Sequence, residues 1–367
     1  MAIRIEPYTP ERAEAARAFN ERMRRASAST DFLLPERPVA GNPAEAIERR
    51  HLLAVDDEAV RGGVLEWGQP AWVAGDSATA FNYQSPLSEG IADRRYGMVS
   101  LSLVRFMQQR GPYVFVVGMG DQANPLPRLL KAGGWTLKPT PFLYKVVRPR
   151  RFITQIGPFR RSRGRRLAAA LAGRSGLAWL AVRAGQARGL FARETGYRLE
   201  PVSGWGDWAD EVWEKFRSSC SFAVARDRRT LDALYPSSDP RLRRFAVRRG
   251  ATTVGWSVCY LTRMEDSAHF GDLLVGSILD CVACEDAREA VAALTARELA
   301  RAGAELTLTN QMQDRWVQAF RRCGFRAGPS NYLLALSPQL AKAVEAQADG
   351  GGRIHVTRGD GDGRIHL

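Results

Sequence analysis

Apolar residues recur along this chain at two spacings, which predict short strands and helices with one buried face. Alternation of apolar with polar residues predicts a strand, and apolar residues three or four positions apart predict a helix. In the first half of the chain the two patterns follow one another without long gaps. They predict strands at 3–7, 51–55, 60–66, 80–84, 113–118 and 142–147, and helices at 9–23, 43–50, 98–109 and 124–134.

The same order of elements recurs in the second half. The patterns there predict strands at 197–202, 244–247, 252–261, 269–282, 305–310 and 332–336, and helices at 207–216, 287–302 and 315–323. A chain of 367 residues is long for one domain and suits two, each with its own core. We therefore expect an α/β fold with mixed sheets. Its parts are a domain at 1–148, a linker at 149–195, a domain at 196–340 and a Gly-rich tail at 341–367.

The formal net charge of +14 is concentrated in the expected linker. Between Arg148 and Arg193 lie twelve arginines, no lysine and no acidic residue, with apolar runs at 167–172 and 177–182. This pattern predicts amphipathic helices that either lie on an anionic membrane face or strap the two domains together. Aromatic residues are not interleaved with the arginines, so DNA is not expected as a partner.

Cysteine usage and the lack of long apolar runs bear on the compartment. No apolar run approaches the roughly 20 residues that cross a bilayer, and residues 1–6 lack the apolar core of a signal peptide. Cys281 and Cys284 form a Cys-x-x-Cys pair without a second pair. We expect buried free thiols and no metal, with a zinc or redox site as the alternative. The cytoplasm is the expected location, at the inner membrane face if the linker binds lipid.

The stretch from Ala80 to Gln109 carries the clearest candidate chemistry. It predicts a strand, a loop with basic residues and a glycine, and then an amphipathic helix. The first amides of a helix have no partner within the helix, and its dipole is positive at that end, which suits a phosphate group. Each such interaction contributes only about 0.3–1 kcal/mol, so Arg94 and Arg95 would have to add to it.

The loop sequence Arg94-Arg-Tyr-Gly97-Met-Val99 resembles the Arg/Gln-x-x-Gly-x-Gly/Ala loop of the GNAT acyltransferases, which grips the pyrophosphate of acyl-coenzyme A. The valine departs from the small residue of that pattern. The order of elements over 1–148 also matches the GNAT fold. The resemblance implies acetyl-CoA or another acyl-CoA as donor, held by Arg94, Arg95, Tyr96, Gly97, Met98 and Val99.

A second GNAT element resembles the segment from Asn124 to Trp135. The family's asparagine at this place lines the acyl pocket, so the resemblance implies that Asn124 contacts the donor. Leu130 stands near the position of a tyrosine that is a common general acid in the family, so this acid is missing. The incoming amine must also lose a proton, so a carboxylate or an ordered water chain near the thioester is expected to act as base. Glu89, just past the central strand, and Glu66, on the preceding strand, are the candidates.

The second half resembles the family less at the loop. Phe320-Arg-Arg-Cys-Gly-Phe325 matches the family's turn, but the segment 281–288 has no glycine and presents Glu285 and Asp286. Carboxylates at a helix N-terminus repel a pyrophosphate, so we expect coenzyme A only in the first half. The tandem layout resembles the Fem-type aminoacyl transferases. The signatures at 85–90, 118–120 and 357–360 resemble GNAT-like proteins of bacterial exopolysaccharide loci.

The Gly-rich tail admits two interpretations. It is either a disordered end, or a segment that folds back and brings Arg358 and Asp360 to a substrate, which the apolar Ile354 and Val356 favour. Three functions stay open for the whole chain. It is an acyl-CoA-dependent N-acyltransferase acting on an amino sugar or another saccharide-type acceptor, an aminoacyl-tRNA-dependent transferase of Fem type, or a non-catalytic GNAT-fold scaffold.

Overall fold

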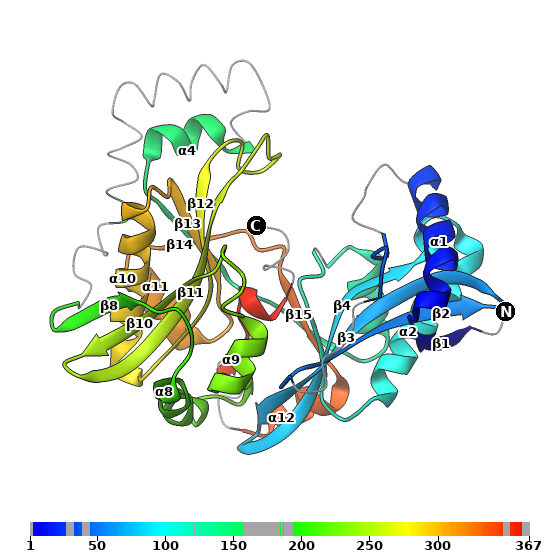
Figure 1. Ribbon diagram of the computed structural model, residues 1–367, viewed down its shortest axis with the longest axis horizontal. Coiled ribbons are helices and arrows are strands. Elements are labelled where there is room, and N and C mark those ends of the chain that lie inside the picture. Colours follow the sequence, from blue (N-terminus) through cyan, green and yellow to red (C-terminus); the bar gives the residue numbers. More distant parts are fainter. Residues whose placement is uncertain are drawn as a thin grey trace. The chain divides into compact units, whose positions relative to one another are not determined.

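The computed structural model of the protein describes residues 3–26, 33–38, 45–120, 122–157, 184, 186, 194–347 and 353–361. The chain divides into two compact units. Unit 1 comprises Met1–Pro139 and Asn331–Ala348, and unit 2 comprises Thr140–Ser330 and Asp349–Leu367. Each unit contains mixed β-sheet structure with helices beside it, as Figure 1 shows for α1 and α2 in unit 1 and for α10 and α11 in unit 2. The expected α/β fold class is confirmed.

In unit 1 the strands lie in the order β1–β2–β3–β4–β5–β15–β6. Neighbours are antiparallel except β4 and β5, which are parallel. The strands are β1 (Arg4–Pro7), β2 (Glu48–Asp56), β3 (Ala59–Val73), β4 (Asp76–Ser88), β5 (Val114–Val117), β6 (Thr136–Pro139) and β15 (Leu333–Leu336). The helices are α1 (Ala13–Ala26), α2 (Gly97–Gln109), α3 (Pro125–Ala132) and α12 (Pro338–Glu345).

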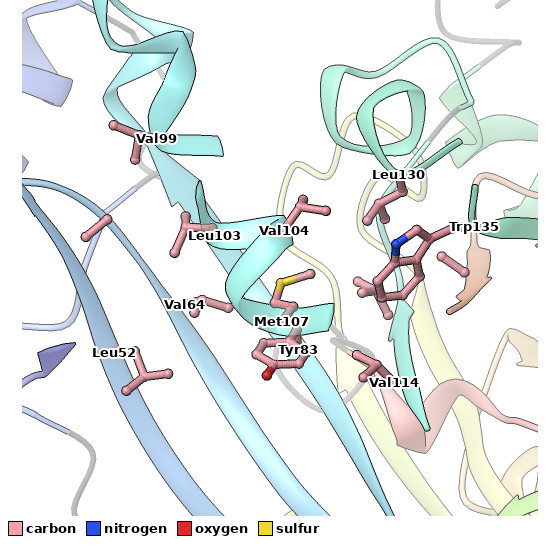
Figure 2. Packing of buried hydrophobic residues seen from close by; sticks show 13 residues of the cluster. Leu52, Val64, Tyr83, Val99, Leu103, Val104, Met107, Val114, Leu130 and Trp135 are labelled. Carbon is pink, nitrogen blue, oxygen red and sulfur yellow. The ribbon is translucent and has the colours of Figure 1, made fainter. Parts of the chain in front are cut away.

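Two apolar clusters hold the helices of unit 1 to its sheet. Successive strand residues point to opposite faces, so Leu52 packs in the cluster with α2 whereas Leu53 packs in the cluster with α1. The α2 cluster fixes that helix across β2, β3 and β4 (Figure 2). Its labelled members are Leu52, Val64, Tyr83, Val99, Leu103, Val104, Met107, Val114, Leu130 and Trp135.

In unit 2 the strands lie in the order β14–β7–β13–β12–β11–β10–β8. They are β7 (Phe142–Val146), β8 (Tyr197–Pro201), β10 (Arg243–Arg249), β11 (Thr252–Arg263), β12 (Leu274–Ala283), β13 (Leu306–Asn310) and β14 (Arg326–Gly328). A further parallel pair joins β9 (Phe222–Val224) to β16 (Ile354–His355). The helices are α4 (Pro149–Gln155), α8 (Asp207–Arg217), α9 (Arg228–Leu234), α10 (Arg288–Arg301) and α11 (Asp314–Arg322).

Two strands lie in the unit opposite to the one expected. The strand β7, expected to close the first sheet, pairs with β13 and β14 of unit 2. The strand β15, expected to close the second sheet, pairs with β5 and β6 of unit 1. An apolar strand pattern predicts that a segment is buried in a sheet but does not choose its partner, which explains the difference.

A further expectation is wrong, because residues 48–50 belong to β2 and not to a helix at 43–50. Glu48, Arg49 and Arg50 pair with β3 at Gly68, Trp67 and Glu66. Residues 48–50 are the polar and only partly buried start of β2, and its apolar residues begin at Leu52. So few apolar residues can fit a helical spacing by chance. Tertiary pairing overrides such a short pattern.

The linker helices expected at 167–172 and 177–182 lie outside the described residues. All five cysteines are free; four are buried, and Cys284 is half-buried. Burial raises the pKa of Cys220 to about 12, so that thiol is protonated at neutral pH. Among the described residues, no helix has both the length and the apolarity to span a membrane.

Candidate functional site

The strands β4 and β5 part shortly after they meet. Their parallel pairing joins Phe81 to Val114 and Asn82 to Phe115. Beyond these pairs, β4 runs on to Ser88 and β5 to Val117 without pairing to one another in the described chain. Beyond Asn82 the backbone of β4 is therefore not paired with β5. We refer to this place as the parting of β4 and β5.

A bulge in β4 marks the same place. The register between β3 and β4 shifts between Gly63 and Leu65, and Ser85 has a φ of 47°, in the left-handed region. An extra residue in one strand bends that strand and redirects its side chains. The bulge follows Gln84, so the rest of β4 departs from the line of its first half.

The loop after β4 leads into the N-terminus of α2 through two short 3-10 turns. The Gly90 amide donates to Ser88 Oγ over 3.1 Å, and the Arg95 amide donates to Asp93 Oδ1 over 3.0 Å. These two amides are therefore satisfied within the loop. No side chain caps α2 itself, although the Gly97 amide donates to the Arg94 carbonyl, and a methyl group added at Gly97 would meet no atom within 4 Å. The open end of the predicted pyrophosphate loop is thus the start of α2.

The two predicted arginines of this loop differ in their surroundings. Arg95 is tied to Asp93, with Nη2 to Oδ2 at 2.6 Å. Arg94 is exposed, and its guanidinium has no hydrogen-bond or ion-pair partner among the described residues. Arg94 is therefore the arginine that can bind an anion without first breaking an ion pair.

Val99, which departs from the small residue of the GNAT pattern, points into the core. It is fully buried in the α2 cluster (Figure 2), and its Cγ1 would lie 3.0 Å from a methyl group at Gly62. The branched side chain therefore packs beneath the helix and not over its first amides. Tyr96 lies under the Arg61 guanidinium, 4.1 Å from ring centroid to Cζ, and Met98 is half exposed.

Glu89 lies directly after β4 and is 5% exposed. Its carboxylate accepts from Arg22 Nε at 2.7 Å and from Arg61 Nη1 at 3.0 Å. Burial alone would raise the pKa of Glu89, but the bonds from Arg22 and Arg61 outweigh it and lower that pKa. To act as a general base, Glu89 would have to accept a proton while its carboxylate is paired with both Arg22 and Arg61.

Glu66 occupies a similar position on β3. It is 1% exposed and accepts from the Tyr83 hydroxyl at 2.6 Å and from Arg110 Nε at 2.9 Å. Burial and the Glu66 carboxylate both raise the pKa of Tyr83, so its hydroxyl stays protonated and donates. The two predicted bases thus belong to separate polar clusters within unit 1, and in each cluster arginine neutralises the charge of the carboxylate. Their catalytic role stays a prediction.

Comparison with known proteins shows which fold the chain resembles. No family model matches the chain, and no curated protein does. The GCN5-related N-acetyltransferase from Anabaena variabilis ATCC 29413 matches 94% of this chain and 75% of its own, with a TM-score of 0.52 and 11% identity. A probable N-acyltransferase of unknown function from Enterococcus faecalis V583 matches 97% of this chain and 81% of its own, with a TM-score of 0.52 and 8% identity.

The chain has a GNAT-like fold. At such low identities the likeness concerns the fold alone, and it assigns no ligand or reaction to this chain. Two further residues, from the segment predicted to resemble the acyl-pocket element, have local contacts. Asn124 precedes α3, and its Nδ2 donates to the Met119 carbonyl over 3.2 Å. Leu130 is fully buried in the α2 cluster and so has a packing role.

The predicted substrate residues Arg358 and Asp360 belong to unit 2, whereas the other predicted site residues belong to unit 1. Asp360 is 3% exposed and lies 2.6 Å from Arg226 Nη2. Arg358 Nη1 donates to Asn310 Oδ1 over 3.0 Å. Asp360 is therefore a buried structural acid in unit 2 and does not present a free carboxylate to a substrate.

Sequence reasoning missed the arginines that hold the two glutamates. Arg22 lies three residues after the buried Phe19 on α1, so helical spacing could have placed it on the buried face. Arg61 and Arg110 carry no such signal, because an arginine on a strand or at a helix end is usually solvated. Only the paired strands bring these residues together.

Proposed function

We propose that the chain is an acyl-CoA-dependent N-acyltransferase whose donor binds to unit 1. The observation that carries the proposal is the parting of β4 and β5, which leads to a helix start without a side-chain cap, beside the exposed Arg94. A pantetheine chain contains amide groups that can pair with strand backbone, and the space between two parting strands suits such an extended group. The diphosphate can then reach the first amides of α2 and Arg94.

The chemistry requires an amine to attack the thioester carbonyl, lose a proton and release the thiol of coenzyme A. Glu89 is the proposed base because it lies nearest in sequence to the loop and is ionised at neutral pH, since its pKa is lowered. A lowered pKa makes a carboxylate a weak base, so transfer through an ordered water is the expected route. Glu66 is the second candidate for this role.

The proposed acceptor is an amino sugar or another saccharide precursor in polysaccharide or cell-envelope biosynthesis. Its support is the sequence resemblance of residues 85–90 and 357–360 to GNAT-like proteins of exopolysaccharide loci. The arginines of 149–195 support a location at an anionic membrane surface. A panel of amino sugars, amino acids and peptide amines, assayed by release of free thiol, tests the acceptor class.

Thermal-shift titration with acetyl-CoA and with a longer acyl-CoA tests donor binding. Donor at 100 times its dissociation constant should stabilise the chain by about 2.7 kcal/mol. Arg94→Ala should weaken binding at least tenfold. Arg105→Ala removes the same charge from an exposed position further along α2 and should leave binding unchanged. An unchanged transition temperature of the wild-type chain at saturating donor refutes the proposal.

A non-catalytic scaffold is the second candidate. It is favoured by the ion pairs of Glu66 and Glu89, which leave neither carboxylate free. The two candidates separate in one experiment, because a scaffold releases no thiol with any acceptor, whether or not it binds the donor. Donor binding without turnover on any amine would favour a scaffold that uses acyl-CoA as a structural ligand.

A further inference from the structure

The C-terminal segment Arg353 to Gly361 is ordered and buried in unit 2, although its sequence is rich in glycine and charge. All of its residues except Arg353 and Arg358 are buried. Ile354, Val356 and His355 are 0% exposed. A disordered end is thus excluded for this segment, which has the burial of a bound ligand or of a core strand.

The segment lies where β12 and β13 part. These strands pair in parallel through Val275–Ser277 and Leu306–Leu308. Beyond that pairing, the segment contacts the chain that follows β13. The Met312 amide donates to the Val356 carbonyl over 3.0 Å, and Gln311 forms an isolated bridge with Thr357.

The segment also meets β12 and pairs with β9. A methyl group added at Gly359 would lie 3.4 Å from the Leu279 carbonyl oxygen of β12. Ile354 pairs in parallel with Phe222 of β9. The Ser221 amide donates to the Arg353 carbonyl over 3.0 Å. Main-chain pairing of an extended peptide with the edge of a strand gives affinity that depends little on the peptide's side chains.

A buried ion pair gives side-chain recognition at the other end of the segment. Arg226 is 0% exposed, with Nη2 at 2.6 Å from Asp360 Oδ1 and Nε at 2.6 Å from Asp280 Oδ2. Asp360 Oδ2 also accepts from the Thr357 amide at 2.8 Å, which closes a capping box. The guanidinium of Arg226 therefore binds one carboxylate of the segment, Asp360, and one of β12, Asp280.

Gly359 supplies a steric requirement next to this ion pair. A methyl group at Gly359 would lie 2.0 Å from the Tyr235 hydroxyl oxygen, and that hydroxyl donates to Asp280 Oδ2 over 2.9 Å. Any side chain there would displace Tyr235 from Asp280. The site thus accepts a glycine followed by an aspartate.

We propose that unit 2 is a peptide-binding domain, and that the C-terminal segment 353–361 of the same chain is its ligand. The segment fills the parting of β12 and β13, which corresponds in strand order to the parting of β4 and β5 in unit 1. Unit 2 therefore takes an extended peptide that contains Gly-Asp where unit 1 takes a donor. The comparison with unit 1 rests on the proposed function, whereas peptide binding does not.

Exchange of the segment tests the proposal in the full chain. A protease site is inserted between Gly350 and Gly351, the folded chain is cut, and a labelled peptide of residues 353–367 is added without acyl-CoA. The cut chain should keep its segment through gel filtration and exchange it slowly for the labelled peptide. Peptides with Gly359→Ala or Asp360→Asn should compete at least tenfold more weakly than the native peptide.

Matched variants of the chain complete the test. Gly359→Ala in the cut chain should release the segment, whereas Gly204→Ala, where a methyl group meets no atom within 4 Å, should retain it. Circular dichroism follows the folding of unit 2. Failure of the labelled peptide to enter a folded cut chain refutes the proposal, and so does unfolding of unit 2 whenever the segment leaves. Dimers that exchange segments between uncut chains would refute binding within one chain.

Discussion

The buried arginine of unit 2 gives the sharpest stability prediction. Arg226→Met removes the only guanidinium within ion-pair distance of Asp280 in the described chain, and leaves Asp280 and Asp360 buried without it. Breaking one partner of a buried ion pair costs about 3–5 kcal/mol. For a unit of this size, each kcal/mol lowers the transition temperature by about 2–4 °C, so the expected loss is roughly 6–20 °C.

The pH dependence should differ between the wild-type chain and this variant. Burial alone would raise the pKa of Asp280, but the Arg226 charge outweighs it and lowers that pKa below its ordinary value. Stability from a lowered carboxylate pKa is fully present above about pH 4 and is lost as the pH falls further. Without Arg226, burial raises the pKa of the Asp280 carboxyl. The variant should therefore gain stability as the pH falls from 7 towards 4, where the wild-type contribution is constant.

Calorimetry at pH 7 and pH 5 checks both parts of this prediction. Arg241→Met is the control, because it breaks an ion pair with Asp239 in which the arginine side chain is 66% exposed. Such surface pairs contribute about 0–1 kcal/mol. If Arg226→Met costs no more than the control, or if its stability does not rise towards pH 5, the buried ion pair does not stabilise unit 2 as described.

Three further predictions concern unit 1. Burial lowers the pKa of His51 from 6.5 to about 4, so the free energy of unfolding should fall as the pH drops from about 6.5 to 4. In denaturant titrations, this fall should be smaller in His51→Leu than in the wild-type chain, by up to about 3 kcal/mol. Tyr83→Phe removes the hydroxyl that donates to Glu66 and should cost about 1.5–3 kcal/mol by calorimetry, and a neutral result would contradict the bond. Gly62→Ala puts a methyl group 2.3 Å from the Leu87 carbonyl oxygen and should cost at least about 1–3 kcal/mol in the same assay, unless β4 moves away at no cost.

Sequence patterns located most helices and strands because each pattern reports burial of one face. The expected helix at 287–302 is α10 (Arg288–Arg301), and the expected strand at 305–310 is β13 (Leu306–Asn310). The short helix α9 was missed, although Asp227 caps it by accepting from the Thr230 amide over 2.8 Å. An aspartate followed by a polar first turn is a start signal that the pattern of apolar residues does not contain.

The sequence predicted the loop of the candidate site, but it did not predict the side chains that surround its carboxylates. The loop after β4 and the start of α2 follow from local sequence, because a strand, a glycine and an amphipathic helix are consecutive. The partners of Glu89 and Asp360 are not local. Arg22 is 67 residues from Glu89, and Arg226 is 134 residues from Asp360. A single sequence gives no signal for such pairs.

The exchanged strands constrain how this polypeptide can be made. β15 lies between β5 and β6, and the Val114 amide donates to Ser337 Oγ across 223 positions. During synthesis the sheet of unit 1 therefore stays incomplete until Leu333–Leu336 have left the ribosome. If the gene were cut between the two halves of the sequence, the first sheet would lack β15 and the second would lack β7. The unpaired strand edges left behind would be prone to aggregation. Each sheet therefore needs a strand from the other half of the sequence.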